Sequence, residues 1–205
     1  MLRLDHLAVS ALTLDEGVAT VEAALGVPLA GGGKHAHMST HNRLLSLGEL
    51  YLEVIATDPT APAPAWPRWF DLDHFTGPPR LTNWIAACDD LEAELALSPR
   101  GTGTPVALSR GDLRWRMAVP QNGRLPYDGC FPALIAWQGP LHPAALLPDQ
   151  GVRLKQLEIA HPDAEALTDQ LKIRLPDPRI VFETAGQKAM RATFSTPHGH
   201  RFLGD

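Results

Sequence analysis

Three segments of the chain share one pattern, in which a short apolar strand is followed by an amphipathic helix. The strands begin at Leu4, Leu81 and Leu154, so their starts lie 77 residues apart (4 to 81) and then 73 apart (81 to 154). In each strand the first, fourth and sixth residues are apolar, and the third is His, Asn or Gln. A nearly constant period of this kind is typical of a structural unit that is repeated along the chain. We therefore expect a fold built from repeated units.

Each unit continues beyond its helix with further strands. The expected helices cover residues 14–25, 89–97 and 163–171. The strands expected after them cover residues 42–47 and 50–55, then 113–119 and 131–137, and finally 180–183 and 189–194 with a short piece at 201–203. Turn residues separate the paired strands, as in the Gly48-Glu49 pair of the first unit. Each unit therefore reads β-α-β-β, and the first two have room for one more strand.

Proline-rich stretches mark the boundaries between the units. They cover residues 58–67 and 139–148, where linkers are expected. The chain divides into a first module at 1–60, a second at 77–140 and a shorter third unit at 151–205. The helices are too few and too short to cover both faces of the sheets, so one face is left for a cleft. The fold class we predict is α+β, with all three units in one compact body.

Composition excludes several classes of protein. With 205 residues the chain is long enough to bury a core without disulfides, and its two cysteines lack metal-ligand spacing. The formal net charge of -5 leaves no basic surplus for phosphate contacts, so we expect no nucleic-acid partner. The N-terminal residues lack a secretory apolar region, and the apolar run 50–56 is too short for a span. We therefore expect a cytoplasmic protein without a membrane partner.

Several short motifs are distinctive. They are Leu4-Asp5-His6-Leu7, Gly33-Lys34-His35, residues 40–44 and 51–55 in the first unit, and residues 77–81, 113–116 and 134–137 in the second. Together they resemble the glyoxalase-like domain of the vicinal-oxygen-chelate superfamily, which includes glyoxalase I, extradiol dioxygenases and bleomycin-resistance proteins. The resemblance covers most of residues 1–145. It implies paired βαβββ modules whose curled mixed sheets surround a cleft holding a divalent metal, here with a shorter third βαββ unit.

The resemblance also implies where metal ligands should lie. In metal-binding members each module supplies one ligand from its first strand and one, usually Glu, from its last, and these positions match His6 and Glu53. Imidazole and carboxylate ligands suit Zn, Fe, Mn, Ni or Co. The second module offers Asn83 opposite His6 and Ala136 opposite Glu53, with Gln138 as a substitute on the same strand face. The implied site is incomplete unless a loop histidine joins it. The candidates are His37, His41 and His74.

Glu53 lies between two apolar residues of a strand, where a carboxylate is costly unless it is paired or hydrated. One interpretation places Glu53 in the cleft, as a metal ligand or a catalytic base. The other pairs it with Arg43 across the predicted hairpin. That ion pair would lower the pKa of the carboxyl group and make Glu53 a poor base.

Further candidates lie near these positions. Three of the nine histidines fall within residues 35–41, either in a solvated loop or partly in the cleft. Of these we select His41 as a second catalytic residue. The expected ligand-binding residues are Asn42, Arg43, Asn83, Arg114 and Arg116. The last two arginines flank Trp115, and they either bind a carboxylate or phosphate in the cleft or lie solvated on the outer face.

Two functional hypotheses follow, and both place a small organic molecule in the cleft between the modules. In the first, the protein is a metal-assisted lyase, isomerase or dioxygenase, whose cation chelates two adjacent substrate oxygens and stabilises an enolate or related oxyanion. In the second, it is a metal-free binding or sequestration protein whose metal site has lapsed. The missing ligands of the second module favour the second hypothesis or an unusual metal-free enzyme. A homodimer is left open.

Overall fold

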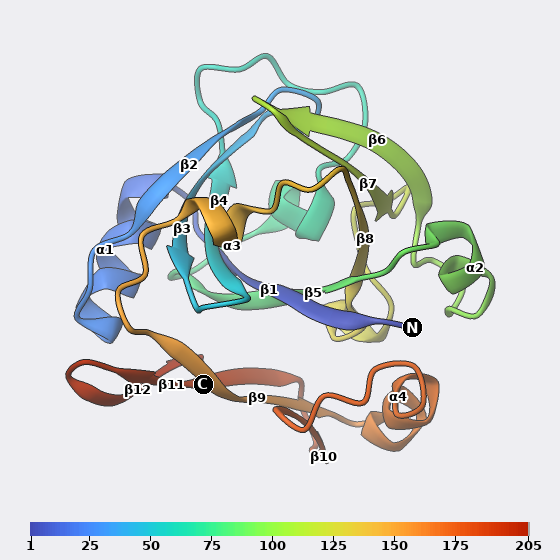
Figure 1. Cartoon of the computed structure of the whole chain (residues 1–205). Coiled ribbons are helices and arrows are strands. Elements are labelled where there is room, and N and C mark those ends of the chain that lie inside the picture. The colour runs from blue at the N-terminus through green and yellow to red at the C-terminus, as the bar shows by residue number, and fades with distance from the viewer. Residues whose placement is uncertain (205) are drawn as a thin grey trace.

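The computed structural model describes residues 1–204, which form two β-sheets with four short α-helices (Figure 1). The first module contains β1 (Arg3–Ser10), α1 (Leu14–Leu25), β2 (Ala30–His35), β3 (Thr40–Ser46) and β4 (Tyr51–Thr57). The second contains β5 (Arg80–Ala87), α2 (Leu91–Ala96), β6 (Thr104–Arg110), β7 (Leu113–Val119) and β8 (Ala133–Gln138). Two 3₁₀ turns, η1 (Trp69–His74) and η2 (Tyr127–Gly129), lie in the loops. No helix within residues 1–204 is long and apolar enough to cross a membrane.

The two modules form one eight-stranded sheet in the order β2-β3-β4-β1-β5-β8-β7-β6. Within each module the first strand runs parallel to the last, since β1 pairs with β4 and β5 pairs with β8. The modules are joined by antiparallel pairing of β1 with β5. The sheet curls until its edge strands β2 and β6 come into contact (Figure 1). The expected α+β class and curled mixed sheet are thereby confirmed, and each of the first two modules has the element order βαβββ.

Helix α1 shows how closely local sequence determines these elements. Thr13 caps its first turn by accepting a hydrogen bond from the backbone N–H of Glu16. Gly26 ends it with a left-handed φ of 73°. In the first turn of the helix, a Cβ on Gly17 would lie 2.5 Å from Cγ1 of Val54 in β4. The glycine therefore lets the helix approach the outer face of the sheet.

The third unit is a separate four-stranded sheet. It follows the short helix α3 (Pro143–Leu146) and contains β9 (Arg153–His161), α4 (Ala164–Leu171), β10 (Ile180–Thr184), β11 (Ala189–Thr196) and β12 (Gly199–Gly204). The short piece expected at residues 201–203 is a full strand, β12, so the unit is βαβββ rather than βαββ. Its strand order is β10-β9-β11-β12, because the crossover through α4 places β10 directly beside β9 in parallel. In the first module the strand after the helix, β2, is instead separated from β1 by β3 and β4, so the third unit is not a further copy of the module.

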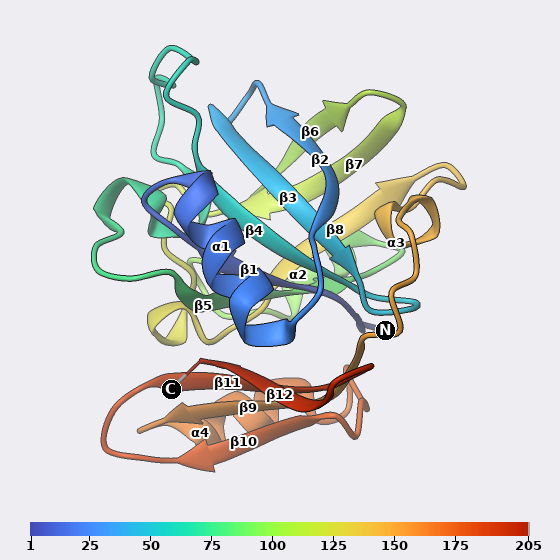
Figure 2. The same ribbon diagram turned by 90° about the vertical axis from the view of Figure 1, so that its left-hand side faces the viewer.

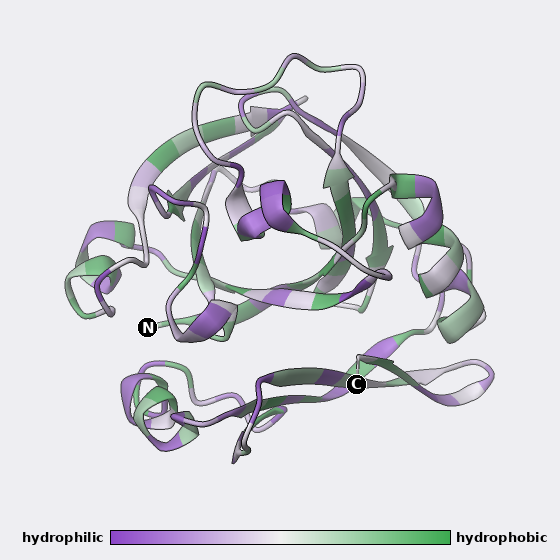
Figure 3. Ribbon diagram, turned by 180° about the vertical axis from the view of Figure 1, so that it is seen from behind, coloured by the Kyte–Doolittle hydropathy of each residue, from purple (hydrophilic) through white to green (hydrophobic). Residues whose placement is uncertain are grey.

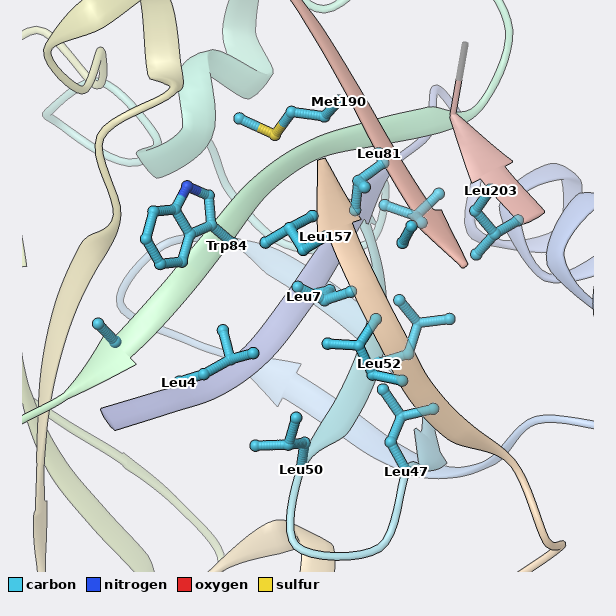
Figure 4. Packing of buried hydrophobic residues seen from close by; sticks show 14 of the residues in the cluster. Leu4, Leu7, Leu47, Leu50, Leu52, Leu81, Trp84, Leu157, Met190 and Leu203 are labelled. Atoms are coloured by element: carbon cyan, nitrogen blue, oxygen red, sulfur yellow. The ribbon is translucent and has the colours of Figure 1, made fainter. Parts of the chain in front are cut away.

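The third sheet packs against the outer face of the curled sheet (Figure 2). Hydrophobic and hydrophilic residues alternate along strands on both sides of this junction, as Figure 3 shows. The apolar side chains meet in one core, seen in Figure 4, where Leu4, Leu7 and Trp84 face Leu157 and Leu203. The opposite face of the same strands carries a second apolar cluster inside the curl. One face thus forms a sheet-on-sheet core, and the other lines an interior.

We expect the two sheets to unfold together, because they share this core. Leu157 of β9 is 0% exposed, so replacing it with Ala should lower the free energy of unfolding by about 2–5 kcal/mol. The control Leu146→Ala removes a side chain that is 61% exposed and should change it by less than about 0.5 kcal/mol. Urea unfolding followed by circular dichroism measures both values. A loss below 1 kcal/mol in Leu157→Ala, or separate transitions for the two sheets, would contradict the shared core.

Candidate functional site

Polar side chains gather on the inner face of β1 and β4, in the first module. The parallel register places His6 beside Tyr51 and Ala8 beside Glu53. The imidazole of His6 stacks on the ring of Tyr51, with ring centroids 4.2 Å apart and planes inclined by 14°. Burial, with the nearby negative charges of Asp5 and Glu53, raises the pKa of Tyr51 well above its usual value. The phenol is therefore neutral across the physiological pH range.

A β-bulge brings Asp5 to the same site. In the pairing of β1 with β5, Leu4 lies opposite Ala86 and His6 lies opposite Ile85, so Asp5 is an extra residue without a partner. The bulge breaks the alternation of side chains, which lets two consecutive residues turn inward. Nδ1 of His6 lies 2.5 Å from Oδ1 of Asp5. Without the bulge, the two side chains would point to opposite faces of the sheet.

The Asp5 carboxylate is buried but well supplied with donors. Its Oδ2 accepts hydrogen bonds from the indole nitrogen of Trp137 at 2.9 Å and from Nε2 of His142 at 3.1 Å. Burial raises the pKa of Asp5, but the hydrogen bonds from His142 and His6 outweigh it and hold the pKa well below the usual range. Asp5 is therefore ionised and can only accept, so Nδ1 of His6 carries the hydrogen.

Glu53 faces the other nitrogen of His6. Oε2 of Glu53 lies 3.7 Å from Nε2 of His6, too far for a hydrogen bond. Its Oε1 accepts a hydrogen bond of 2.5 Å from the side-chain amide of Asn42. Oδ1 of Asn42 in turn accepts from Nη1 of Arg110 and from the backbone N–H of Gly33, both at 2.9 Å. These donors fix the orientation of the Asn42 amide, which links the carboxylate to the guanidinium.

Arg110 reaches this position from the end of β6, across the closed edge of the curl. Its side chain passes over Gly33 of β2, where a Cβ would lie 2.9 Å from Cδ of Arg110. Nη1 of Arg110 also lies 3.3 Å from Nε2 of His35, whose Nδ1 is 3.1 Å from the hydroxyl of Thr40. Burial lowers the pKa of His35 to about 4, and Arg110 adds to this effect although Glu53 opposes it. His35 is therefore a neutral imidazole that accepts from Arg110.

These groups surround a small space that we call the inner cavity, with a volume of about 30 Å³. It is lined by His6, His35, Asn42, Tyr51, Glu53, Trp69, Phe70, Arg110, Trp115, Met117, Ile135 and Trp137. The indole nitrogen of Trp69 is buried and has no hydrogen-bond partner within residues 1–204. A buried donor of this kind needs an acceptor from a water or a ligand. The cavity is large enough for about one water.

One wall of the inner cavity comes from the linker between the modules. Trp69 and Phe70 of η1 are buried in the interior cluster. Phe70 and the following Asp71 have left-handed backbones, with φ of 58° and 53°. Such conformations cost about 1 kcal/mol or more for residues other than glycine. The wall is thus held in a strained backbone conformation by the packing of its aromatic side chains.

The donor set does not fit a tightly held transition metal. His6 and Glu53 are close enough to share an ion, and the Asp5–His6 contact is the kind that orients a metal-binding imidazole. However, residues 1–204 contain no group of three or more His, Cys, Asp or Glu side chains that could hold a metal. The positively charged Arg110 also lines the same cavity and would repel a cation. The expected metal site is therefore half a site.

The second module does not supply the missing ligands. Asn83 is the counterpart of His6, but the counterpart of Glu53 is Ala133 rather than Ala136, because β8 pairs Ala133 with Ile85 as β4 pairs Glu53 with Ala8. Ala136 belongs to the outer core, so Gln138, on the same face, is not a substitute ligand. Trp137, the neighbour of Ala136, lines the inner cavity. An alanine thus stands at the fourth position, as the repeat implied, although at another residue.

The loop histidines do not complete the site either. His37 is exposed and stacks on Trp66, with ring centroids 4.3 Å apart. His74 is exposed and lies 2.6 Å from the carboxylate of Asp71. His41 lies on the outer face of β3. None of the three lines the inner cavity.

Several expected site residues lie outside the interior. Asn42 points inward, so its neighbours His41 and Arg43 point outward by strand alternation. Arg43 is exposed and does not pair with Glu53, which excludes the ion pair we considered as the alternative. The remaining two arginines, Arg114 and Arg116, flank the inward Trp115 and also lie outside. Arg114 donates to backbone carbonyls, and Arg116 pairs with Glu92 of α2.

Sequence comparison and structural comparison agree on the family of this chain. A family model described as a glyoxalase-like domain matches residues 4–174. The chain belongs to this glyoxalase-like family. The motifs in its first two units therefore indicated the family correctly. No curated protein matches the sequence.

Solved structures share the fold of this glyoxalase-like chain. A hypothetical protein from Staphylococcus aureus is 15% identical, with a TM-score of 0.64, and the match covers 92% of this chain and 88% of that one. A methylmalonyl-CoA epimerase from Mycobacterium tuberculosis is 17% identical, with a TM-score of 0.44 over 70% of this chain and 91% of the epimerase. The first likeness supports the fold, and the second is too loose to bear on activity.

Sequence reasoning missed several residues of the site in this glyoxalase-like chain. They are Asp5, Tyr51, Arg110 and His142. Among the histidines of residues 35–41 we selected His41, whereas His35 is the one that lines the inner cavity. Asp5 and Tyr51 lie within the motifs that indicated the family, close in sequence to His6 and Glu53. These motifs could therefore have pointed to Asp5 and Tyr51 as further site residues. Arg110 ends a strand that we did not predict, and no local pattern connects it with Asn42. Its role arises only when the sheet closes.

The hydrogen-bond network around Asp5 reaches the protein surface. Asp5, Trp137 and His142 line a groove of about 780 Å³ between the curled sheet and the third unit. His142 is the most exposed of them, with 27% of its side chain accessible. The groove is larger than the inner cavity but lacks Glu53 and Arg110. It connects the hydrogen-bond network to solvent through His142.

We expect Asn42→Ala to destabilise this glyoxalase-like domain more than substitution of its neighbour. The change leaves Glu53 and Arg110 buried without their shared amide, which should lower the free energy of unfolding by about 2–4 kcal/mol. The matched control is His41→Ala, on the outer face, where Nε2 has no hydrogen-bond partner within residues 1–204. It should change stability by less than about 1 kcal/mol. Equal losses in both variants, measured by urea unfolding at pH 7, would show that the amide bridge is unimportant.

Stability should also depend on pH through His35. Its pKa is about 4 in the fold and 6.5 for the ordinary side chain, so the unfolded chain takes up the proton first as pH falls. The contribution of His35 to the free energy of unfolding is fully present above pH 6.5 and is lost as the pH falls from 6.5 to 4. The whole contribution is about 3 kcal/mol. His35→Gln keeps polar atoms but does not titrate, so its unfolding free energy should fall less over this range. Identical pH profiles for the two proteins would refute this assignment.

Proposed function

We propose that this protein binds a small polar organic molecule in the inner cavity without a transition metal. The observation that carries the proposal is the unpartnered indole N–H of Trp69, in a cavity that also contains charged groups. A ligand oxygen would satisfy this donor. This interpretation corresponds to the metal-free hypothesis, with the inner cavity as the part of the cleft that binds.

The walls offer complementary groups to such a ligand. Trp69 and Arg110 supply hydrogen-bond donors, while Oε2 of Glu53 and Nε2 of His6 supply acceptors. Arg110 has no carboxylate within salt-bridge distance among residues 1–204, so it favours a ligand with an oxyanion or a polarised carbonyl. Glu53 is placed to accept a proton from the same ligand. Asn42 and Asp5 position Glu53 and His6 through hydrogen bonds.

A ligand larger than a water requires the cavity to open. The wall formed by Trp69 and Phe70 is the segment we expect to move, because it belongs to a linker rather than to the sheet. Its left-handed residues also relax when the segment leaves its position. The strands beneath it stay in place, so Glu53 and His6 remain oriented while the ligand enters.

The metal-assisted enzyme is the second candidate, and the His6–Glu53 pair is the observation that favours it. Under this alternative Glu53 is a ligand rather than a base. The finer expectations of a lyase, isomerase or dioxygenase activity belong to it. A cytoplasmic location and a homodimer remain predictions under either candidate.

Metal analysis separates the two candidates. We expect tag-free protein, incubated in turn with Zn, Fe, Mn, Ni and Co and then desalted, to retain far less than one metal per chain. The reason is that two ligands beside a guanidinium bind a divalent ion weakly. Elemental analysis by mass spectrometry gives the ratio. Stoichiometric metal that is lost in both His6→Ala and Glu53→Ala would establish the metal-assisted candidate instead.

Ligand binding itself can be followed at Trp69 as part of the same test. A fragment library of small carboxylates, amides and phenols is titrated into labelled protein while the indole N–H resonances are recorded by NMR. Some members should shift the Trp69 resonance in a saturable way, and the effect should weaken in Glu53→Gln. Trp66→Phe, a change at the exposed surface, is the control and should leave binding unchanged. A library without effect on Trp69 would argue against the proposal.

A further inference from the structure

A second cavity lies on the far side of Phe70, which lines both spaces. We call it the outer pocket, and its volume is about 330 Å³, at the lower end of the range for small-molecule sites. Its walls come from three parts of the chain. The linker contributes η1, the second module contributes the start of β5 and the η2 loop, and the third unit contributes Lys188.

The charged and titratable groups that line the outer pocket are Arg80, Arg124, Lys188, Asp71, Asp128 and His74. The Asp71 carboxylate is already shared between His74 at 2.6 Å and Arg124 at 3.1 Å. Oδ2 of Asp128 lies 3.4 Å from Nε2 of His161, but this nitrogen has no hydrogen-bond partner within residues 1–204 and the Asp128 side chain is 78% exposed. Asp71 is therefore paired and Asp128 is not, yet the three cations of the lining outnumber its two carboxylates.

Two cations of the outer pocket are not neutralised. Arg80 donates only to the backbone carbonyls of Thr76 and Pro78 and stacks over the ring of Phe75, 4.4 Å from its centroid. Lys188 donates to the backbone carbonyl of Asp128. Within residues 1–204 neither cation has a carboxylate at salt-bridge distance. The pocket thus presents positive charge to whatever enters it.

Asn83 provides an independent indication of a ligand. This residue is 3% exposed and lines the outer pocket, beside the position that a Cβ of Gly129 would occupy, 3.7 Å from Nδ2. Its side-chain amide makes no hydrogen bond within residues 1–204, in contrast to Asn42, whose amide is fully used. Neither amide atom is among the side-chain atoms that are fully buried without a partner within residues 1–204, so both can be reached from the pocket, where a ligand can bond to them.

We propose that the outer pocket binds the carboxylate or phosphate group of a small organic molecule. Arg80 and Lys188 supply the charge, and Asn83 supplies a hydrogen bond to a neighbouring polar atom of the same molecule. Both anions suit a guanidinium and an ammonium group that face one space. This site goes beyond the proposed function, because it uses none of the groups that surround the inner cavity except Phe70.

Titration with two simple anions tests the site. Inorganic phosphate and propionate are added separately to the full chain at constant ionic strength, and the Asn83 side-chain amide resonance is followed by NMR. At least one anion should bind saturably, and the stronger of the two identifies the group that the pocket prefers. The double variant Arg80→Gln/Lys188→Gln should weaken binding by about tenfold or more. The matched control Lys155→Gln, an exposed lysine of β9, should not change it.

A further variant separates binding from folding. Asn83→Leu replaces an amide without partners by an apolar group of similar size, so it should unfold at the same or a higher urea concentration. The backbone chemical-shift response to the anion should weaken in this variant without being lost, because Arg80 and Lys188 still supply the charge. Glu53→Gln, in the inner cavity, should leave anion binding intact, which keeps this result independent of the proposed function. Absence of saturable binding of either anion in the millimolar range would overturn the proposal. Binding that is equal in the double variant and the control would overturn it as well.

Discussion

The antiparallel pairing of β1 with β5 is the constraint on which the rest of the structure depends. It joins two modules that each leave one strand edge unpaired, and it makes a single sheet of eight strands. Because side chains alternate along both strands, one face of the joint becomes the floor of the interior and the other meets the third sheet. The bulge at Asp5 lies in this same pairing. Module assembly and the chemistry of the interior are therefore set by one strand pair.

Burial of charge in the interior is tolerated because each charged group there has at least one hydrogen-bond partner. Asp5 receives three donors, and the Asn42 amide connects Glu53 to Arg110. A buried ion that loses its partner costs several kcal/mol, so such a network favours one arrangement over all others. The rigidity that results is useful for binding, since the groups are already oriented before a ligand arrives.

Much of the fold could be predicted from the sequence, because apolar periodicity and turn residues determine the strands and helices locally. Helix α1 was expected at its observed bounds, and the repeat indicated both modules. Strand β2 was missed because the run of residues 31–33 is all glycine, and its strand conformation comes from pairing with β3. The site was harder to predict. His6, Glu53 and Asn42 were recognised, whereas Arg110 joins them through sheet closure, which no local pattern encodes.

The distribution of the tryptophans has an optical consequence. Three of the five, Trp69, Trp115 and Trp137, border the inner cavity, and the rings of the last two lie 5.5 Å apart. Trp84 is sealed in the opposite core, where its indole nitrogen donates to the carbonyl of Cys130, and Trp66 is at the surface. Indole fluorescence responds to nearby charge and polarity. The fluorescence of three of the five tryptophans should therefore respond to what occupies the inner cavity. The protein thus carries an intrinsic fluorescent reporter for the contents of its own interior.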